Sequence, residues 1–89
     1  MLPIRPTTQF KRDLKRAARQ GRDIQKVEKA LEILSNPSPL PDFYKDHQLK
    51  GVWRDFRECH LEPDCLLIYT LNDFELRPTR LGTHTELFD

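Results

Sequence analysis

A proline-rich segment near the middle of the chain separates two kinds of apolar pattern. Residues 37–41 read Pro-Ser-Pro-Leu-Pro, and no helix is expected to run through them because proline lacks a backbone N–H and fixes φ. Before this segment apolar residues recur at helical spacing, and after Gly51 they follow the pattern of strands. With 89 residues the chain has room for a single domain, 1–89, with a modest core and an open or shallow site.

Two amphipathic helices are predicted before the proline-rich segment. The first is capped by Thr7 or Thr8, runs to about Gln20 and ends at Gly21. The second is capped by Asp23 and stops at Asn36-Pro37, since the residue before a proline disfavours helical geometry. The apolar faces are formed by Phe10, Leu14, Ala17 and Ala18 in the first helix and by Ile24, Val27, Leu31 and Leu34 in the second.

Short strands are predicted on both sides of this helical hairpin. Residues 2–6 are expected to form a strand at a sheet edge, where prolines are tolerated. Residues 52–61, 65–71 and 75–81 are expected to form three consecutive antiparallel strands, with turns at 62–64 and 72–73, and residues 83–88 a short helical or extended tail. The predicted fold class is α+β with the order β-α-α-β-β-β. The helical hairpin covers one face of a small sheet and leaves the other face free for a ligand.

The charge is unevenly distributed, although the net charge is only +1. Residues 1–36 carry nine Lys or Arg against four Asp or Glu, whereas residues 37–89 carry six against ten. Tight binding of free nucleic acid would need a more basic chain, but the basic first segment suits an acidic partner or an RNA backbone. No apolar run fits a membrane span or a secretory signal, so a cytoplasmic protein without membrane contact is expected. Cys59 and Cys65 are expected as free thiols.

Three histidines, His47, His60 and His84, all lie in the second half of the chain. A meander of strands brings strand ends and the following loops together, so these side chains are able to converge. Histidine acts as a general base or acid near neutral pH. RNA carries its own nucleophile, the 2′-hydroxyl, so two imidazoles and a cation meet the needs of cleavage without a metal or another cofactor.

Several other residues are candidates for supporting roles, and each has an alternative structural interpretation. Arg80 can hold a phosphate, or pair with a carboxylate at the surface. Asp64 can orient a histidine, or cap a turn. Phe88 can stack on a base, or pack the tail onto the core. The remaining aromatic candidates are better explained as packing residues: Trp53, Phe56 and Tyr69.

Two other types of site are less well supported. The three histidines with Asp64 could bind zinc, but no HxxxH or CxxC spacing accompanies them. Cys59 beside His60 suggests a thiol nucleophile, but neighbouring residues of a strand point to opposite faces of the sheet.

The second half of the chain resembles the YafQ-type toxins of the RelE-like superfamily. The resemblance rests on motifs in a fixed order, whereas the first half matches mainly in helix pattern and basic character. These motifs are Tyr44-Lys45-Asp46-His47 with Leu49, Gly51 and Trp53, then Arg57, His60, Glu62-Pro63-Asp64 and Leu67-Ile68-Tyr69, and finally Arg80-Leu81-Gly82-Thr83-His84 with Leu87-Phe88.

This resemblance implies a RelE-like fold and the toxin half of a type II toxin–antitoxin pair. It also implies ribosome-dependent mRNA cleavage, with the 70S ribosome, mRNA and a cognate antitoxin as partners. His47, His60, Asp64 and His84 match the family's catalytic set, and Arg80 and Phe88 match its supporting active-site residues. Cys65 stands where the resemblance implies a tryptophan, which calls a substrate contact from this position into question. His84 is favoured as either the acid or the base, and the choice between His47 and His60 for the other role stays open.

Three alternative functions are compatible with parts of the pattern. A gyrase poison of the ParE type would share the fold but has no need of general acids, so the histidines argue against it. A ribosome-independent RNase is disfavoured by the near-neutral charge. A DNA-binding or interaction module that uses the basic first helix would leave the histidines and Arg80 without a role.

Overall fold

The chain forms three helices, four strands and two short 3₁₀ turns in the computed structural model, which describes residues 1–36 and 38–88. In chain order the elements are α1 (Thr8–Arg19), α2 (Ile24–Ser35), η1 (Asp42–Tyr44), β1 (His47–Gln48), η2 (Gly51–Trp53), β2 (Arg57–Glu62), β3 (Cys65–Leu71), β4 (Leu76–Gly82) and α3 (His84–Phe88).

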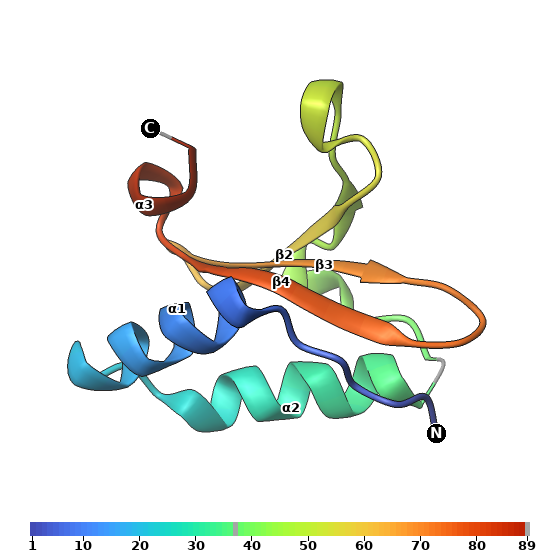
Figure 1. The fold of residues 1–89 in the computed structure, drawn as a ribbon, viewed down its shortest axis with the longest axis horizontal. Coiled ribbons are helices and arrows are strands. Elements are labelled where there is room, and N and C mark those ends of the chain that lie inside the picture. Colours follow the sequence, from blue (N-terminus) through green and yellow to red (C-terminus); the bar gives the residue numbers. More distant parts are fainter. Residues whose placement is uncertain (37, 89) are drawn as a thin grey trace.

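The four strands make one antiparallel sheet in the order β1-β2-β3-β4. Helices α1 and α2 lie on one side of this sheet, and α3 and η2 lie on the other (Figure 1). The predicted α+β class is therefore confirmed, and so is the helical hairpin on one face. The tail, which the sequence left open between two conformations, is helical.

The predicted helix caps are confirmed. The Thr7 hydroxyl accepts a hydrogen bond from the amide of Phe10 at 3.0 Å, and the Asp23 carboxylate accepts one from the amide of Gln25 at 3.0 Å. Gly21, between the helices, has a φ of 79°, a left-handed conformation that glycine adopts without a Cβ clash. Helix α2 ends at Ser35, and Pro37, which the sequence offers as its stop, lies outside the described residues.

The first predicted strand is wrong in extent. Residues 2–6 run beside β4, but only Ile4 forms a bridge, a parallel one with Leu76. The amide of Arg5 donates to the Leu76 carbonyl, and the amide of Leu76 donates to the Pro3 carbonyl. Pro3 and Pro6 have no N–H to donate, so this edge cannot continue as a regular ladder.

The predicted strand at 52–61 is also wrong in its first part. Gly51, with a φ of 66°, opens the turn η2, and β2 begins only at Arg57. Trp53 closes that turn by packing its indole edge-to-face on Phe56, with ring centroids 5.4 Å apart. In addition, the two-residue strand β1 at His47–Gln48, which the sequence pattern did not predict, extends the sheet at the edge beyond β2.

Apolar side chains pack on both faces of the central strand β3. The main core lies between the sheet and helices α1 and α2. A smaller cluster covers part of the opposite face, so that face is less free than the sequence suggested. The smaller cluster consists of Leu66, Ile68 and Leu87 with Leu49, Trp53 and Phe56 around them. In the part of the chain that the structure describes, no helix is both long and apolar enough to cross a membrane.

Candidate active site

The strand register places several polar side chains on the sheet face that α1 and α2 leave uncovered. His47 is paired with Glu58, Glu58 with Ile68, and Ile68 with Arg80. Residues directly opposite each other in an antiparallel sheet project from the same face, so these four side chains form one row across the sheet. His60, two residues after Glu58 on β2, lies on the same face.

The three imidazoles come together around the carboxylate of Glu58. The Nε2 atom of His60 lies 3.5 Å from Glu58 Oε1, that of His84 3.9 Å from the same oxygen, and that of His47 3.8 Å from Oε2. The ring centroids of His47 and His60 are 6.4 Å apart, and those of His60 and His84 are 6.1 Å apart. The structure thus brings together three histidines that are separated in sequence by up to 37 positions.

The ring of His47 is held by the backbone of its own loop. Its Nδ1 lies 2.8 Å from the carbonyl oxygen of Lys45, which has a φ of 51°. A carbonyl only accepts, so Nδ1 carries the hydrogen and Nε2 of the neutral ring has a free lone pair. Asp46, the residue between Lys45 and His47, anchors the loop, because Tyr69 donates to its Oδ1 at 2.6 Å and Arg57 donates to its Oδ2 at 3.0 Å. Burial and the Asp46 carboxylate raise the pKa of Tyr69, so its hydroxyl stays a donor.

His84 is placed by a capping box at the start of α3. The Thr83 amide donates to the Glu86 carboxylate at 2.9 Å, and the Glu86 amide donates back to the Thr83 hydroxyl at 3.1 Å. Both the amide and the Nδ1 of His84 face Asp64 Oδ1, at 3.1 and 3.3 Å. The hydrogen bond from the His84 amide, and then that from its ring, hold the pKa of Asp64 below its usual value. Asp64 therefore orients His84 as an ionised carboxylate.

Arg80 begins on the imidazole face, but its guanidinium turns to the helix side and meets Asp13 of α1. Its Nε lies 2.8 Å and its Nη2 3.4 Å from the Asp13 oxygens, and the amide of Leu81 donates to the same carboxylate at 3.0 Å. Burial raises the pKa of Asp13, but hydrogen bonds from Arg80, the Leu81 amide and Gln9 outweigh this and bring it below its usual value. Among the described residues, Asp13 is the carboxylate that Arg80 contacts, so Arg80 forms the predicted ion pair, but with a buried carboxylate and not with one at the surface.

The structure shows the packing role considered for Phe88, and its role in stacking on a base stays a prediction. Its ring packs edge-to-face on Trp53, with centroids 5.6 Å apart, and lies 6.2 Å from the ring of His84. It nevertheless keeps 40% of its surface exposed beside the imidazoles. Trp53, Phe56 and Tyr69 are packing residues, as predicted.

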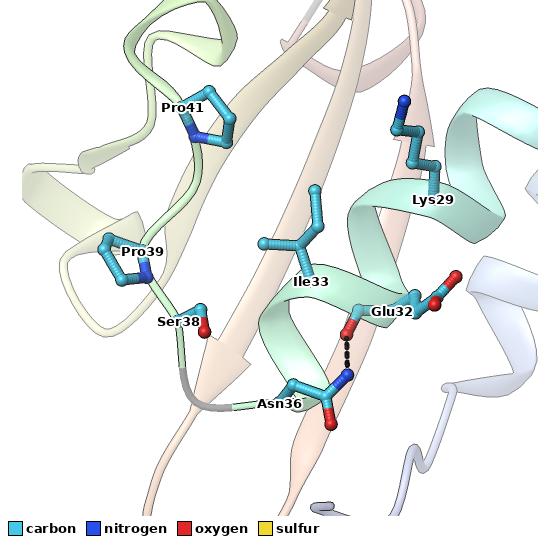
Figure 2. Close-up of a pocket in the computed structure, with 7 residues that line it drawn as sticks. All are labelled: Lys29, Glu32, Ile33, Asn36, Ser38, Pro39 and Pro41. Atoms are coloured by element: carbon cyan, nitrogen blue, oxygen red, sulfur yellow. Dashed lines mark hydrogen bonds between the residues drawn. The ribbon is translucent and has the colours of Figure 1, made fainter.

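Two cavities differ in their relation to this cluster. One of about 320 Å³ adjoins His60 and is lined by the Phe43 ring, Lys45 and the chain around Pro63. A larger one of about 460 Å³ lies between α2 and residues 38–41, and Figure 2 shows Ile33 facing Pro39 and Pro41 across it. The larger cavity has no histidine in its lining, whereas the smaller one is lined by His60 of the imidazole cluster.

Cys59 is not a nucleophile partner for His60. Its side chain is fully buried in the core on the helix side of β2, whereas His60 lies on the opposite face. Burial, helped by the nearby carboxylates of Asp46 and Glu58, raises the pKa of the Cys59 thiol to about 12. Burial also raises the pKa of Cys65.

Both thiols are therefore expected to resist labelling in the native protein. At pH 8 the reaction with a disulfide reagent should be limited by unfolding, because the thiolate is the nucleophile and both side chains are buried. The labelling rate should rise in step with the unfolded fraction in urea. The fully unfolded chain should release two equivalents of the reagent's thiol per chain, one for each cysteine. Rapid stoichiometric labelling without denaturant would contradict the burial described above.

Glu58 is the residue of this cluster that the sequence interpretation missed. A single acid in a strand suggests a solvent-facing position, but Glu58 is only 4% exposed. The available signal was its spacing, because Glu58 and His60 stand two apart on a predicted strand and so share a face. Asp13 was missed for a different reason, since its partners on β4 lie 67 and 68 positions away.

Comparison with known proteins gives a consistent result. Residues 2–89 match the family described as "Bacterial toxin of type II toxin-antitoxin system, YafQ". The mRNA interferase toxin YafQ of Escherichia coli K12 is 44% identical over 81 residues, which covers 90% of this chain and 88% of the relative.

Solved structures agree with this sequence match. The crystal structure of YafQ from E. coli BL21(DE3) superposes with a TM-score of 0.95 at 40% identity, covering 100% of both chains. The toxin in a crystal structure of the E. coli DinJ–YafQ toxin–antitoxin complex gives a TM-score of 0.91 at 42% identity, covering 99% of this chain and 98% of that one. These likenesses confirm the predicted RelE-like α+β fold. The chain described here therefore belongs to the YafQ family of bacterial type II toxin–antitoxin toxins.

Proposed function

We propose that this toxin is an endoribonuclease that cleaves mRNA and so inhibits translation. The E. coli relative is named an mRNA interferase, which supports the same activity here. The observation that carries the proposal is the convergence of three imidazole Nε2 atoms within 3.9 Å of one carboxylate, on an accessible sheet face. An arrangement of this kind supplies proton transfer, which RNA cleavage requires.

The proposed reaction is an intramolecular attack of the RNA 2′-hydroxyl on the adjacent phosphate. One imidazole takes the proton of the 2′-hydroxyl, and the 2′-oxygen forms a bond to phosphorus. The bond from phosphorus to the 5′-oxygen breaks, and a second imidazole gives its proton to that oxygen. The products are a 2′,3′-cyclic phosphate and a 5′-hydroxyl end. No electron donor, metal or other cofactor takes part in this scheme.

The hydrogen bonds and ion pairs of the rings support a separate role for each histidine in the reaction. His47 is proposed as the base, because its Nδ1 donates to a carbonyl and leaves a lone pair on Nε2. His84 is proposed as the acid, because Asp64 and Glu58 lie on either side of it and balance the charge of its protonated ring. His60, between the two, is proposed to donate a hydrogen bond to the phosphate.

Arg80 and Phe88 are proposed as substrate-contacting residues around this centre. Arg80 uses Nε and Nη2 for Asp13, which leaves Nη1 for a phosphate oxygen as negative charge develops in the transition state. The exposed part of the Phe88 ring beside His84 would stack on a base. The cavity beside His60 gives a neighbouring nucleotide room.

We propose further that cleavage occurs on the 70S ribosome in the cytoplasm. With a net charge of +1 the chain has little general affinity for RNA, so the ribosome would present the mRNA. The positive charge of residues 1–36 suits two partners, ribosomal RNA during cleavage and an acidic antitoxin during inhibition. A toxin–antitoxin complex of the E. coli relative supports an antitoxin partner for this chain.

Mapping the 5′ ends of cellular mRNA after brief induction provides the test of this function. We expect new ends that carry a 5′-hydroxyl and keep a fixed phase relative to the reading frame. Purified toxin alone should leave the same RNA intact. Absence of new ends together with loss of gyrase-dependent supercoiling would favour the gyrase poison instead, and cleavage of naked RNA would contradict ribosome dependence.

A further inference from the structure

We propose that Glu58 is a positioning residue of the nuclease site. Its carboxylate would hold the three imidazoles in one arrangement and balance the charge of whichever ring is protonated. This inference rests on the proposed function, since it concerns how the imidazoles transfer protons to and from RNA. It assigns a role to a buried acid that the reaction scheme above does not otherwise use.

The first support is geometric. His60 and His84 approach one oxygen of Glu58, at 3.5 and 3.9 Å, and His47 approaches the other at 3.8 Å. These separations exceed ordinary hydrogen bonds but lie within the range of ion pairs. The three rings come from β1, β2 and α3, so a single carboxylate links three elements.

The second support is the burial of the charge. Glu58 is 4% exposed, and a buried carboxylate is costly unless positive partners face it. Within residues 1–36 and 38–88, the side chains in ion-pair distance of Glu58 are the three imidazoles, with no Lys or Arg among them. Arg80 belongs to the same cross-strand row but pairs with Asp13.

The charges on the other elements around the cluster lead to the same conclusion. Ile68 of β3, directly opposite Glu58, is apolar, and Asp64 adds a second negative group on the far side of His84. Lys45 lines the cavity beside His60 but is not within ion-pair distance of Glu58. Among the described residues, the groups placed to balance the charge of Glu58 are therefore the three imidazoles.

The third support concerns the proton balance of the reaction. During cleavage one ring gains a proton and another loses one, so the total positive charge near Glu58 stays the same. Because the Nε2 atoms of His47 and His84 both lie within 3.9 Å of the carboxylate, one buried negative charge serves both states. Glu58 is buried and faces the rings, so we expect it to act on the rate and the pH range of cleavage rather than on RNA binding.

Replacing Glu58 with glutamine tests this role, because E58Q keeps the shape and removes the charge. In a purified translation system, cleavage at saturating toxin should fall 10- to 100-fold, as a rough expectation for a displaced proton-transfer group. The half-saturating toxin concentration should stay within about twofold, since the contacts with RNA remain. The alkaline limb of the pH–rate profile should move to lower pH by about one unit, because the acid loses its counter-charge.

Two further variants complete the experiment. E75Q removes a partly buried acid just before β4, where its partner is Arg5, and it should keep the wild-type rate and pH profile. E58D keeps the charge but withdraws it by about 1.5 Å, so it should lower the rate while leaving the alkaline limb in place. It also serves as the test if E58Q does not fold.

The experiment distinguishes failure of the role of Glu58 from failure of the nuclease proposal. An E58Q protein that is folded and has the wild-type rate and pH profile would overturn the role of Glu58 while the nuclease proposal stands. The role would equally be overturned by an E58D protein whose rate is unchanged or whose alkaline limb moves to lower pH. Absence of cleavage by the wild-type protein would instead refute the nuclease proposal.

Discussion

Alanine in place of His84 is expected to lower the rate of mRNA cleavage by about 10³-fold and to abolish growth arrest. The physical reason is the loss of the proposed general acid, whose ring is aimed by Asp64 at 3.3 Å and faces Glu58 at 3.9 Å. Cleavage in a translating extract at fixed toxin concentration measures the effect. The fold should survive, because the His84 side chain is 57% exposed.

Thr85→Ala provides the matched control for this variant. Thr85 is the next residue on α3 and is exposed, so its loss should change neither cleavage nor growth arrest. The midpoint of thermal unfolding should be the same for both variants and the wild type within a few degrees. Undiminished toxicity of H84A would rule out His84 as a proton-transfer group.

Asp13→Ala is expected to cause the largest loss of stability, about 3 kcal/mol of unfolding free energy. The substitution removes a carboxylate that is 1% exposed and leaves several donors on two elements without their acceptor. These donors are the guanidinium of Arg80, the backbone amide of Leu81, the side-chain amide of Gln9 and the guanidinium of Arg16. Urea unfolding followed by circular dichroism gives the value, and Asp55→Asn, at an exposed position, should change it by less than about 0.5 kcal/mol.

The same carboxylate predicts a pH dependence of stability. The pKa of Asp13 is held below its usual value, because its hydrogen bonds outweigh the effect of burial. Its contribution is therefore complete above the pKa of the unfolded chain, and it is lost as the pH falls through the lower, folded value. The difference in stability between wild type and D13N should shrink in this acid range. A difference that stays constant down to pH 2 would mean that the charge of Asp13 does not stabilise the fold.

Local sequence signals predicted the helices and the central strands well. Thr7 and Asp23 cap helices where the sequence places caps, and residues 65–71 form a strand with the predicted bounds. Caps, glycines and apolar periodicity act within a few residues, so a single sequence contains the information. The errors in the predicted strand bounds occur where long-range packing determines the local structure. Trp53 closes a 3₁₀ turn by contacting Phe56 and also Phe88, which lies 35 residues after Trp53.

The candidate site was only partly predictable for a related reason. Residue chemistry singled out His47, His60 and His84, and the meander made their convergence plausible. Nothing near Glu58 in sequence marks it as buried, because its burial depends on rings from β1 and α3. The pairing of Arg80 with Asp13 likewise depends on how α1 lies against β4.

Helix α3 connects the chemistry of the protein with its stability. Within five residues it carries His84 into the imidazole cluster and inserts Leu87, only 7% exposed, over Leu66 and Ile68. A small movement of α3 that withdraws the ring of His84 would also uncover the apolar surface of β3 under Leu87. If this last turn frays, we expect the proposed cleavage to slow and the tendency to aggregate to rise at the same time, so the shelf life and the specific activity of the purified toxin should decline in parallel.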